Sequence, residues 1–389
     1  RFSNLPTAMN TGLAPGAVAS MLLRGSKQHT REQIADAFDK LHARVSLSSD
    51  ASTCSVGIET TRENLIPTLK LVGEILRQPA WDPKEFQQEK EETLAAAEQM
   101  QNDPETLAEN QLGRHLGPYP ASDPRYTDTP EELIAQAKSL TLEQVKAYYD
   151  KVYGASNGEI AVGGDLDRAA IETTLKQMFD SWKSPLTYER IPGQYFDVPA
   201  INKDVVVKDK ANATLVGGLN MVMRDDNPDY LPLTLGNFML GGGFLNSRLA
   251  TRVRQQEGLS YGIGSSFSAG SLDNVGSFGV YAISAPQNTP KVEKAIREEV
   301  ARAVKDGFSE AELASAKSSL LQRREGSRSN DGSLASTLVR YQRIDRRFNW
   351  DADFEKKLMK VTNQQVVDAM RRHFQIDKLS IVKAGDFKK

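Results

Sequence analysis

Cysteine is nearly absent from this sequence of 389 residues. The single cysteine, Cys54, excludes an internal disulfide, and the four histidines are too few for several metal sites. No run of 18 or more apolar residues occurs, so no segment is predicted to span a bilayer. An excess of one charge is also lacking, because 49 basic residues face 51 acidic ones. This balance provides no overall field that would attract nucleic acid or an anionic membrane.

The composition that remains is that of a globular protein with more than one core. Hydrophobic residues make up 39% of the chain and charged residues 26%, which is typical of folded rather than disordered proteins. A single hydrophobic core rarely organises this many residues, so we expect at least two domains.

An internal repeat is the most informative feature of the organisation. Residues 139–167 and 360–387 align without a gap at a constant offset of 221 positions. The matched pairs include Thr141 with Thr362, Gln144 with Gln365, Ile160 with Ile381, Gly164 with Gly385 and Asp165 with Asp386. Both copies predict a helix capped by the threonine, followed by a short apolar strand that ends at Gly-Asp.

A second repeated segment lies upstream of the first. Residues 80–95 align with 307–322 at an offset of 227, which pairs Lys90 with Lys317. The two offsets differ by six, so the first half contains about six additional residues in the loop-rich segment 116–126.

Each half also contains two strands followed by a helix, at residues 42–77 and 259–304. Cys54, Val56 and Ile58 alternate with polar residues, as expected for a half-buried antiparallel strand. The sequence therefore predicts an α+β fold made of two homologous half-domains, each an antiparallel sheet packed with long helices.

The predicted domain boundaries follow from a segment rich in proline. Residues 184–204 contain three prolines and no periodicity, which indicates a linker. We therefore expect an N-terminal half-domain at 1–183 and a C-terminal half-domain at 205–389.

A search for local catalytic motifs finds none. The sequence has no H-E-x-x-H, H-x-x-E-H or C-x-x-C motif and no G-x-S-x-G elbow. The glycines in residues 240–249 lack the G-K-[S/T] ending of a phosphate loop and are interpreted as a turn before a helix. Cys54 is interpreted as a small buried hydrophobe, and the carboxylates Glu89, Glu91 and Glu92 as a solvated helix face.

Residues 16–76 nevertheless resemble the N-terminal half-domain of the pitrilysin/insulinase-type zinc peptidases, which include the mitochondrial processing peptidase and bacterial relatives. Catalytic members carry H-x-x-E-H immediately before Met-Leu-x-x-Gly-[Ser/Thr]-Lys, and residues 21–27 match that second stretch. The resemblance implies a half-clamshell fold. Family members place two strands before the first motif helix, whereas 15 residues precede Gly16 in this sequence: either the N-terminal part is shortened, or further residues precede this numbering.

The resemblance places the family's metal site on residues that cannot bind metal. The two zinc histidines fall on Gly16 and Ser20, the general-base glutamate on Ala19, and the third ligand on Ala96. Zinc needs three or four N, O or S donors and the reaction needs a base, and these residues supply neither. Glu89 matches a supporting glutamate of the family. We therefore expect no metal or water activation in this chain, and zinc in a partner subunit.

The second half matches a different family feature. The C-terminal half-domain of the family carries an arginine and a tyrosine seven residues apart, which correspond here to Arg254 and Tyr261. By the resemblance, the guanidinium donates to a substrate carbonyl and the phenol to the developing oxyanion. Without the surrounding match, Arg254 would be interpreted as an exposed ion-pair residue and Tyr261 as a core aromatic.

The resemblance implies a non-catalytic, substrate-binding subunit of a heterodimeric zinc metalloendopeptidase. Its expected partners are a zinc-bearing homologous subunit and peptide substrates, with peptide added as a strand at a sheet edge. The alternative is a structural scaffold similar to the core proteins of the respiratory cytochrome bc complex; an independent peptidase using another site has no visible constellation to support it. A bacterial protein, periplasmic or cytoplasmic, is favoured over one of the mitochondrial matrix.

Overall fold

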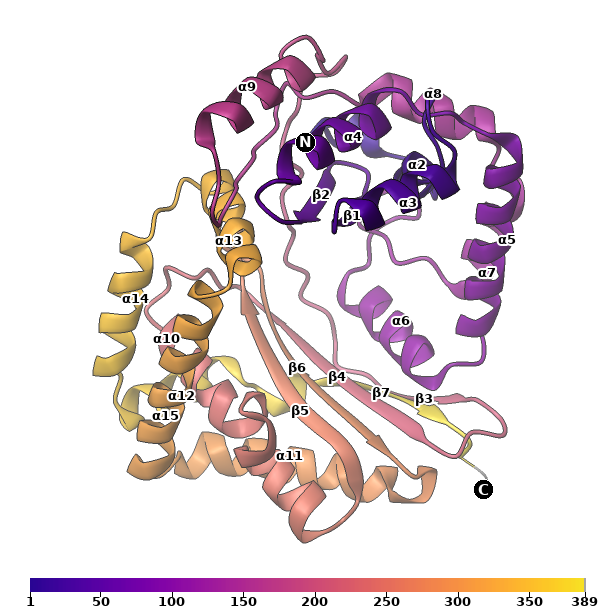
Figure 1. The fold of residues 1–389 in the computed structure, drawn as a ribbon. Coiled ribbons are helices and arrows are strands. Elements are labelled where there is room, and N and C mark those ends of the chain that lie inside the picture. Colours follow the sequence, from indigo (N-terminus) through magenta and orange to yellow (C-terminus); the bar gives the residue numbers. More distant parts are fainter. Residues whose placement is uncertain (388–389) are drawn as a thin grey trace. The chain divides into compact units, whose positions relative to one another are not determined.

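The computed structural model describes residues 1–387 and divides into two compact units (Figure 1). Unit 1 comprises residues 1–99, 119–191 and 331–339, and unit 2 comprises 100–118, 192–330 and 340–389. No helix in the described part of the chain is both long and apolar enough to cross a membrane.

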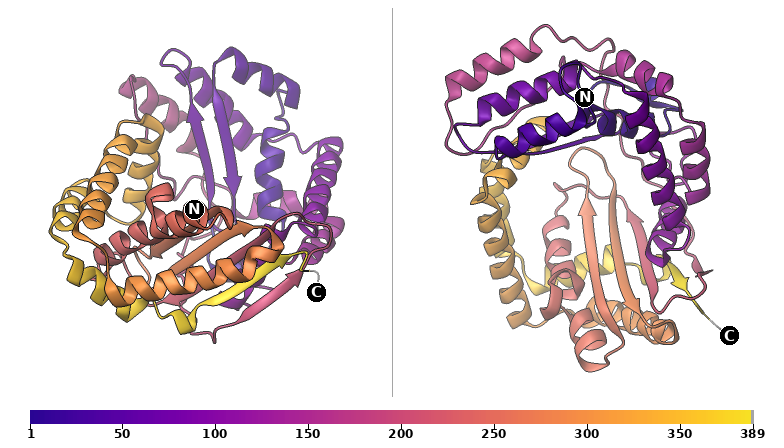
Figure 2. Two further views of the ribbon diagram at one scale, coloured as in Figure 1. Left: turned by 90° about the horizontal axis from the view of Figure 1, so that it is seen from below. Right: turned by 45° about the vertical axis from the view of Figure 1, so that its right-hand side comes forward.

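Unit 1 is a set of helices around one β-hairpin, which appears in Figure 2 as two adjacent violet strands. The two strands pair antiparallel, with Arg44 opposite Glu59 and Ser49 opposite Cys54. The elements are α1 (Leu5–Ala8), α2 (Ala14–Leu23), α3 (Arg31–Lys40), β1 (Arg44–Ser49), β2 (Cys54–Glu59), α4 (Leu65–Arg77), α5 (Pro83–Met100), α7 (Pro130–Ser139), α8 (Leu142–Val152) and α9 (Arg168–Phe179).

The core of unit 1 is built from helix faces that pack on this hairpin. Buried side chains of α2, α4 and α8 form one cluster that includes Val18, Leu22, Ile75 and Val145. Cys54 packs against this cluster from β2 and is half-buried, and desolvation raises the pKa of its thiol. The interpretation of Cys54 as a small hydrophobe in a strand is therefore confirmed.

Unit 2 is organised by a five-stranded sheet in the order β3-β7-β4-β6-β5. Three of its four strand pairs are antiparallel, but β3 and β7 are parallel, so the sheet is mixed. The elements are α6 (Pro104–Leu116), β3 (Asn202–Val206), β4 (Ala213–Met221), α10 (Tyr230–Asn237), η1 (Phe238–Gly242), η2 (Phe244–Asn246), η3 (Ala250–Gln256), β5 (Ser260–Ala269), β6 (Gly276–Ser284), η4 (Pro286–Asn288), α11 (Thr289–Asp306), α12 (Glu310–Arg328), α13 (Asp331–Arg343), α14 (Asn349–Lys360), α15 (Asn363–His373), η5 (Ile376–Lys378) and β7 (Ser380–Gly385). Residues 331–339 of α13 belong to unit 1.

The two faces of this sheet are covered differently. Helices α10, α11 and α15 pack on one face and form the main core of unit 2. Helix α6 packs on the other face over β3, β7 and β4. Gly218 allows this close approach, because a Cβ there would lie 2.4 Å from Cδ1 of Leu116. The outer face of β5 and β6 lies beyond α6 and carries the exposed Tyr281.

The repeat predicted from the sequence is confirmed by equivalent contacts in the two units. Thr141 caps α8 and Thr362 caps α15, each in a capping box with the glutamine three residues later. Lys90 of α5 donates to the backbone oxygens of residues 138 and 140, at 2.6 and 3.1 Å. Lys317 of α12 donates to those of residues 359 and 361, at 3.0 and 2.6 Å.

Two details of the predicted strands are wrong. The segment around Ile160 to Asp165 is not a strand, although its repeat partner is β7. β7 is bonded along both edges, by β3 and by β4, whereas this segment pairs with no strand of the described residues. The sheet of the second half is also not purely antiparallel, because β3 pairs with β7 in parallel.

The compact units do not coincide with the predicted ranges 1–183, 184–204 and 205–389. Helix α6, from the first half of the sequence, lies in unit 2 because its apolar side chains Ala108 and Leu112 pack on the sheet. Residues 331–339, from the second half, lie in unit 1, where a Cβ built on Gly163 would lie 3.3 Å from the backbone oxygen of Asp331.

Candidate functional site

The residues at the positions of the family's metal site lie on two helices of unit 1. Gly16, Ala19 and Ser20 belong to α2, and Ala96 belongs to α5. Ala19 is buried, whereas Ala96 is exposed on α5 two turns after Glu89 and therefore on the same face of that helix. The structure brings Ser20 and Glu89 together, because the Ser20 hydroxyl donates to Oε2 of Glu89.

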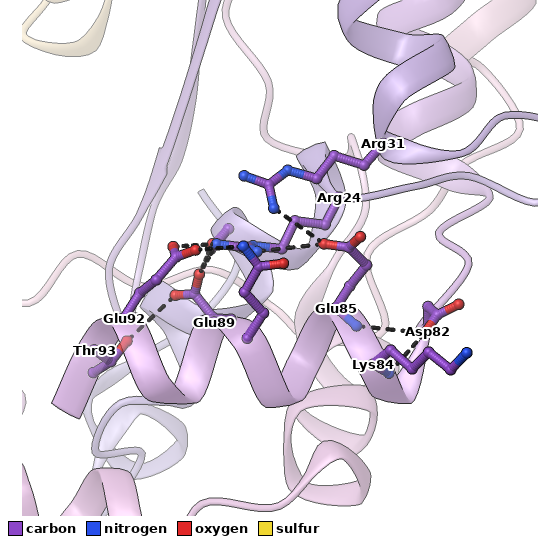
Figure 3. Close-up of polar contacts among 10 residues, drawn as sticks. Arg24, Arg31, Asp82, Lys84, Glu85, Glu89, Glu92 and Thr93 are labelled. Carbon is purple, nitrogen blue, oxygen red and sulfur yellow. Dashed lines mark hydrogen bonds and ion pairs between the residues drawn. The ribbon is translucent and has the colours of Figure 1, made fainter. Parts of the chain in front are cut away.

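Arg24 is the centre of this site, and sequence analysis did not identify it (Figure 3). Its Nη2 lies 2.8 Å from Oε2 of Glu89 and 2.5 Å from Oε2 of Glu92, and its Nη1 lies 3.4 Å from Oε2 of Glu85. Its Nε also donates to the Ser20 hydroxyl at 3.3 Å. One guanidinium thus joins α2 to three carboxylates of α5.

The electrostatics of this cluster favour a fully charged arginine. Burial alone would lower the pKa of Arg24, but the charge of Glu89 and the hydrogen bond to Glu92 raise it above its ordinary value. The hydrogen bond from Arg24 in turn lowers the pKa of Glu92. Glu89 is therefore largely buried against Arg24, and its interpretation as part of a solvated face is wrong, whereas Glu91 and Glu92 are exposed as that interpretation predicts, with Glu92 also bonded to Arg24.

A signal for this cluster was present in the sequence. Arg24 follows Ser20 by four residues, and Glu85, Glu89 and Glu92 are spaced by four and three. Both spacings place the side chains on one face of a helix. Which two helices face each other, however, depends on tertiary packing that the sequence does not state.

A small cavity lies beside Gly16. It has a volume of about 270 Å³ and is lined mainly by apolar groups of α2, α5 and α7, with Glu89, Lys90 and Thr93 as its polar residues. A Cβ built on Gly16 would meet no atom within 4 Å.

The donor set of this site does not fit zinc. Glycine and alanine at three of the four positions offer no donor, and the Ser20 hydroxyl is already bonded to Glu89 and Arg24. Among residues 1–387, no group of three or more His, Cys, Asp and Glu side chains is arranged to hold a metal ion.

In unit 2, Arg254 belongs to the π-helix η3 and is exposed. Two residues earlier, Arg252 is bonded to Glu257, Glu298 and Glu299 at 2.8, 2.5 and 3.1 Å. In contrast, the side chain of Arg254 makes no hydrogen bond or ion pair with any described residue. Helix η3 therefore carries one arginine, Arg252, whose side chain is held in ion pairs, and one, Arg254, whose side chain has no partner among the described residues.

Tyr261 lies at the start of β5, and 82% of its surface is exposed. A β-bulge occurs here, because Ser260 pairs with Ser284 while Gly262 already pairs with Ile283. The extra residue is Tyr261, and a bulge of this kind turns a side chain away from the face that alternation would give it. Its phenol makes no hydrogen bond with any described residue. The interpretation of Tyr261 as a core aromatic is therefore excluded.

A short turn connects η3, which carries Arg254, to β5, which carries Tyr261. The amide of Leu259 donates to the carbonyl of Val253 at 2.9 Å, which ties the end of η3 to the start of β5. Gly258 occupies the turn with φ of 62°, a backbone conformation that glycine adopts without strain.

Tyr281 is a second exposed aromatic residue on the same two strands, and sequence analysis did not identify it. It pairs with Gly264 on β5, and 47% of its surface is exposed. A Cβ on Gly264 would lie 2.7 Å from Cε1 of Tyr281, so the glycine gives the ring room to lie across β5.

The glycines at 241–243 pack closely against neighbouring residues. Gly241 lies in the π-helix η1, and a Cβ there would be 2.5 Å from the backbone nitrogen of Ser265. The interpretation of residues 240–249 as a turn before a helix holds for Gly243 and the segment that leads to the helix at Arg248, but Gly241 and Gly242 belong to a π-helix. Both π-helices, η1 and η3, pack against β5, which carries Tyr261, and π-helical turns are frequent at functional sites.

Comparison with known proteins gives a consistent result. Residues 139–320 match the family model described as the peptidase M16 inactive domain. The chain is 24% identical over 383 residues to a protein of Helicobacter pylori named non-peptidase homolog YmxG, covering 96% of this chain and 85% of that protein. It is 23% identical over 305 residues to an uncharacterized zinc protease of Rickettsia felis, covering 77% and 70%.

A solved structure is similar over nearly the whole chain. The crystal structure of a peptidase M16 inactive domain from Pseudomonas fluorescens superposes with a TM-score of 0.81 at 26% identity, covering 97% of this chain and 90% of that one. The resemblance to this peptidase family and the α+β fold predicted from the sequence are therefore confirmed.

Proposed function

We propose that this chain, an inactive member of the peptidase M16 family, is the substrate-binding subunit of a heterodimeric metalloendopeptidase. Its partner would be a homologous chain with an intact H-x-x-E-H motif, and the bound zinc of that partner would supply the activated water. We further propose that the pair acts on peptides in an enclosed chamber, in the periplasm or cytoplasm of a bacterium.

One observation carries this proposal: Arg254 and Tyr261 are both exposed and make no bond with any described residue. Arg252, two residues before Arg254 on the same helix, is by contrast held in three ion pairs within the fold. A scaffold has no need to leave two strong donors free, whereas a peptide-binding subunit does.

The chemistry of the two side chains suits an extended peptide. The guanidinium of Arg254 can donate to a backbone carbonyl and hold the chain in register. The phenol of Tyr261 can donate to an oxygen on which negative charge develops as the peptide bond is attacked. Neither residue needs a metal of its own for these roles.

The experiment is a cleavage assay on a quenched peptide. The full chain, an H-x-x-E-H chain that co-purifies with it, and the mixture are compared, and only the mixture should cleave. Arg254→Ala and Tyr261→Phe should each lower turnover by about 10- to 100-fold while the complex still forms.

Arg252→Ala is the matched control for Arg254→Ala. It removes the same charge from the same helix but breaks three ion pairs, so it should lower the melting temperature of the chain, whereas Arg254→Ala should not. If the partner is equally active alone, or if Arg254→Ala and Tyr261→Phe change nothing, the scaffold function replaces this proposal.

A further inference from the structure

We propose that the cavity beside Gly16 in unit 1 is a binding pocket for one compact apolar group of about the size of an aromatic ring. The ring belongs either to a small aromatic molecule or to a phenylalanine side chain of a peptide. This inference does not depend on the proposed function, because it concerns unit 1 and not Arg254 or Tyr261.

The wall of the cavity is mainly apolar. Its apolar residues come from α2 with its N-cap, from α5, and from α7 with its C-cap: Leu13, Gly16, Ala17, Phe86, Ala137 and Leu140. Ala17, Phe86 and Ala137 belong to the buried core, so this part of the wall is held by packing. A ring that enters the cavity exchanges water for apolar contacts, and the ring of Phe86 offers it an aromatic neighbour.

The three polar residues of the wall already have partners within the fold. Nζ of Lys90 donates to two backbone oxygens at the C-terminal end of α7, at 2.6 and 3.1 Å. Glu89 lies 2.8 Å from Nη2 of Arg24 and accepts from the hydroxyl of Thr93 at 3.4 Å (Figure 3). A charged ligand would have to compete with these bonds, whereas an apolar ligand leaves them intact.

The volume and the opening of the cavity fit a single ring. An apolar cavity of about 150 Å³ is large enough to bind benzene, and this one measures about 270 Å³. Gly16 is exposed, and a Cβ built on it would meet no atom within 4 Å, so the cavity opens to solvent there. The position that carries a zinc histidine in catalytic members of the family therefore carries no side chain that could close the opening.

The test is a titration of the full chain with fluoroindole, followed by fluorine NMR. The unchanged chain should bind one molecule with a Kd of about 0.1 to 1 mM, as expected for a ligand of this size. Imidazole, a polar ring, should not displace the bound fluoroindole. Gly16→Leu fills the opening from α2 and Thr93→Met fills the cavity from α5, and each should weaken binding at least about tenfold.

Gly326→Leu is the matched control for Gly16→Leu. Gly326 is also an exposed helical glycine, in α12, where a Cβ would meet no atom within 4 Å. Both substitutions replace glycine by a better helix former, so neither should lower the thermal midpoint. Only Gly16→Leu should reduce the affinity for fluoroindole.

Two blocked tripeptides distinguish the sources of the ring. If the pocket takes a side chain of a peptide, Gly-Phe-Gly should displace fluoroindole and Gly-Ala-Gly should not. If neither displaces it, the ligand is a free aromatic molecule.

The absence of saturable binding up to about 10 mM fluoroindole would overturn the proposal, since this exceeds the expected Kd at least tenfold. Displacement by imidazole as effective as displacement by unlabelled indole would also overturn it. So would unchanged affinity in both Gly16→Leu and Thr93→Met, or an equal loss in Gly326→Leu, because the ring would then bind elsewhere.

Discussion

Glycine serves opposite purposes at two helical positions of this chain. At Gly16 of α2 the surroundings are open, since a Cβ would meet no atom within 4 Å. At Gly241 of η1 a Cβ would lie 2.5 Å from both the backbone nitrogen and the hydroxyl of Ser265. The first glycine costs the helix conformational entropy without a packing benefit, whereas the second permits a close contact.

Gly16→Ala should therefore raise the free energy of unfolding by about 0.5 to 1 kcal/mol, because alanine is the better helix former and finds space. Gly241→Ala should lower it by about 1 to 3 kcal/mol through overpacking against β5. Urea denaturation of both variants measures the difference. Equal effects of the two substitutions would contradict the assignment of a packing role to Gly241 alone.

At this scale the sequence indicates which positions cannot bind a metal, but it does not indicate which side chains come together. Gly16, Ala19, Ser20 and Ala96 were identified as positions without ligands by motif alone. Arg24 was not, because its role depends on α5 lying opposite α2, and that arrangement is set by packing between distant segments.

At the scale of elements, one carboxylate links several parts of unit 2. Glu312 of α12 accepts from the amide of Ser309 at 2.7 Å in a capping box, and receives Nε and Nη2 of Arg248 at 2.7 and 3.0 Å. The hydrogen bond from Arg248 lowers the pKa of Glu312 to about 2.

A lowered pKa in the folded state predicts the direction of a pH effect. The contribution of Glu312 to stability is fully present above its ordinary pKa of about 4.5 and is lost as the pH falls toward 2. Thermal melts across this range should therefore show the Glu312→Gln variant less stable than the unchanged chain at pH 6, with the difference closing below pH 4. Glu310→Gln, in the same helical turn but bonded only to Asn363, is the control and should give no such closing gap.

The outer face of β5 and β6 leads to a prediction about peptide binding. Tyr281 lies there opposite Gly264, and its exposed ring can pack on a peptide side chain. Tyr281→Ala should weaken binding of a fluorescein-labelled unstructured peptide by about 5- to 10-fold, as measured by fluorescence anisotropy.

Leu272→Ala is the matched control, since Leu272 is 42% exposed in the turn that joins the same two strands. It should leave peptide affinity unchanged. Equal losses for the two variants would mean that Tyr281 has no specific contact with the peptide.

The elements themselves were largely predictable, and the exceptions have clear causes. The capped helices at Thr141 and Thr362 follow from local signals, and so does the alternation in β2. Strand β7 and the irregular segment near Ile160 have matching sequences, yet only one becomes a strand. Strand formation depends on available neighbours as well as on the pattern. The bulge at Tyr261 has no local signature that the pattern reveals.

At the scale of the whole molecule, the path of the chain prevents separation into two halves. Helix α6 covers β3, β7 and β4 of unit 2. The chain that follows it, residues 119–191, belongs to unit 1, and the chain then returns to unit 2 at residue 192. A fragment that begins at residue 192 would expose Val216, Val382 and Ala384 on that face.

Fragments 1–191 and 192–389 expressed separately should therefore aggregate or lack a cooperative thermal transition. Expressed together they should co-purify and recover the circular dichroism spectrum of the full chain. A cooperative transition of fragment 192–389 alone, at the midpoint of the full chain, would contradict this prediction.

The exchange of helices between the units has a consequence for the history of the gene. At the offset of 227 positions that relates α5 to α12, α6 corresponds to α13. α6 has left the first half for unit 2, and the first part of its counterpart lies in unit 1. Two identical half-length chains that lend each other one helix form a domain-swapped homodimer. Duplication and fusion of the gene for such a chain would convert the exchange of a helix between two molecules into an exchange within one chain. Each half would then need the helix of the other half in order to fold.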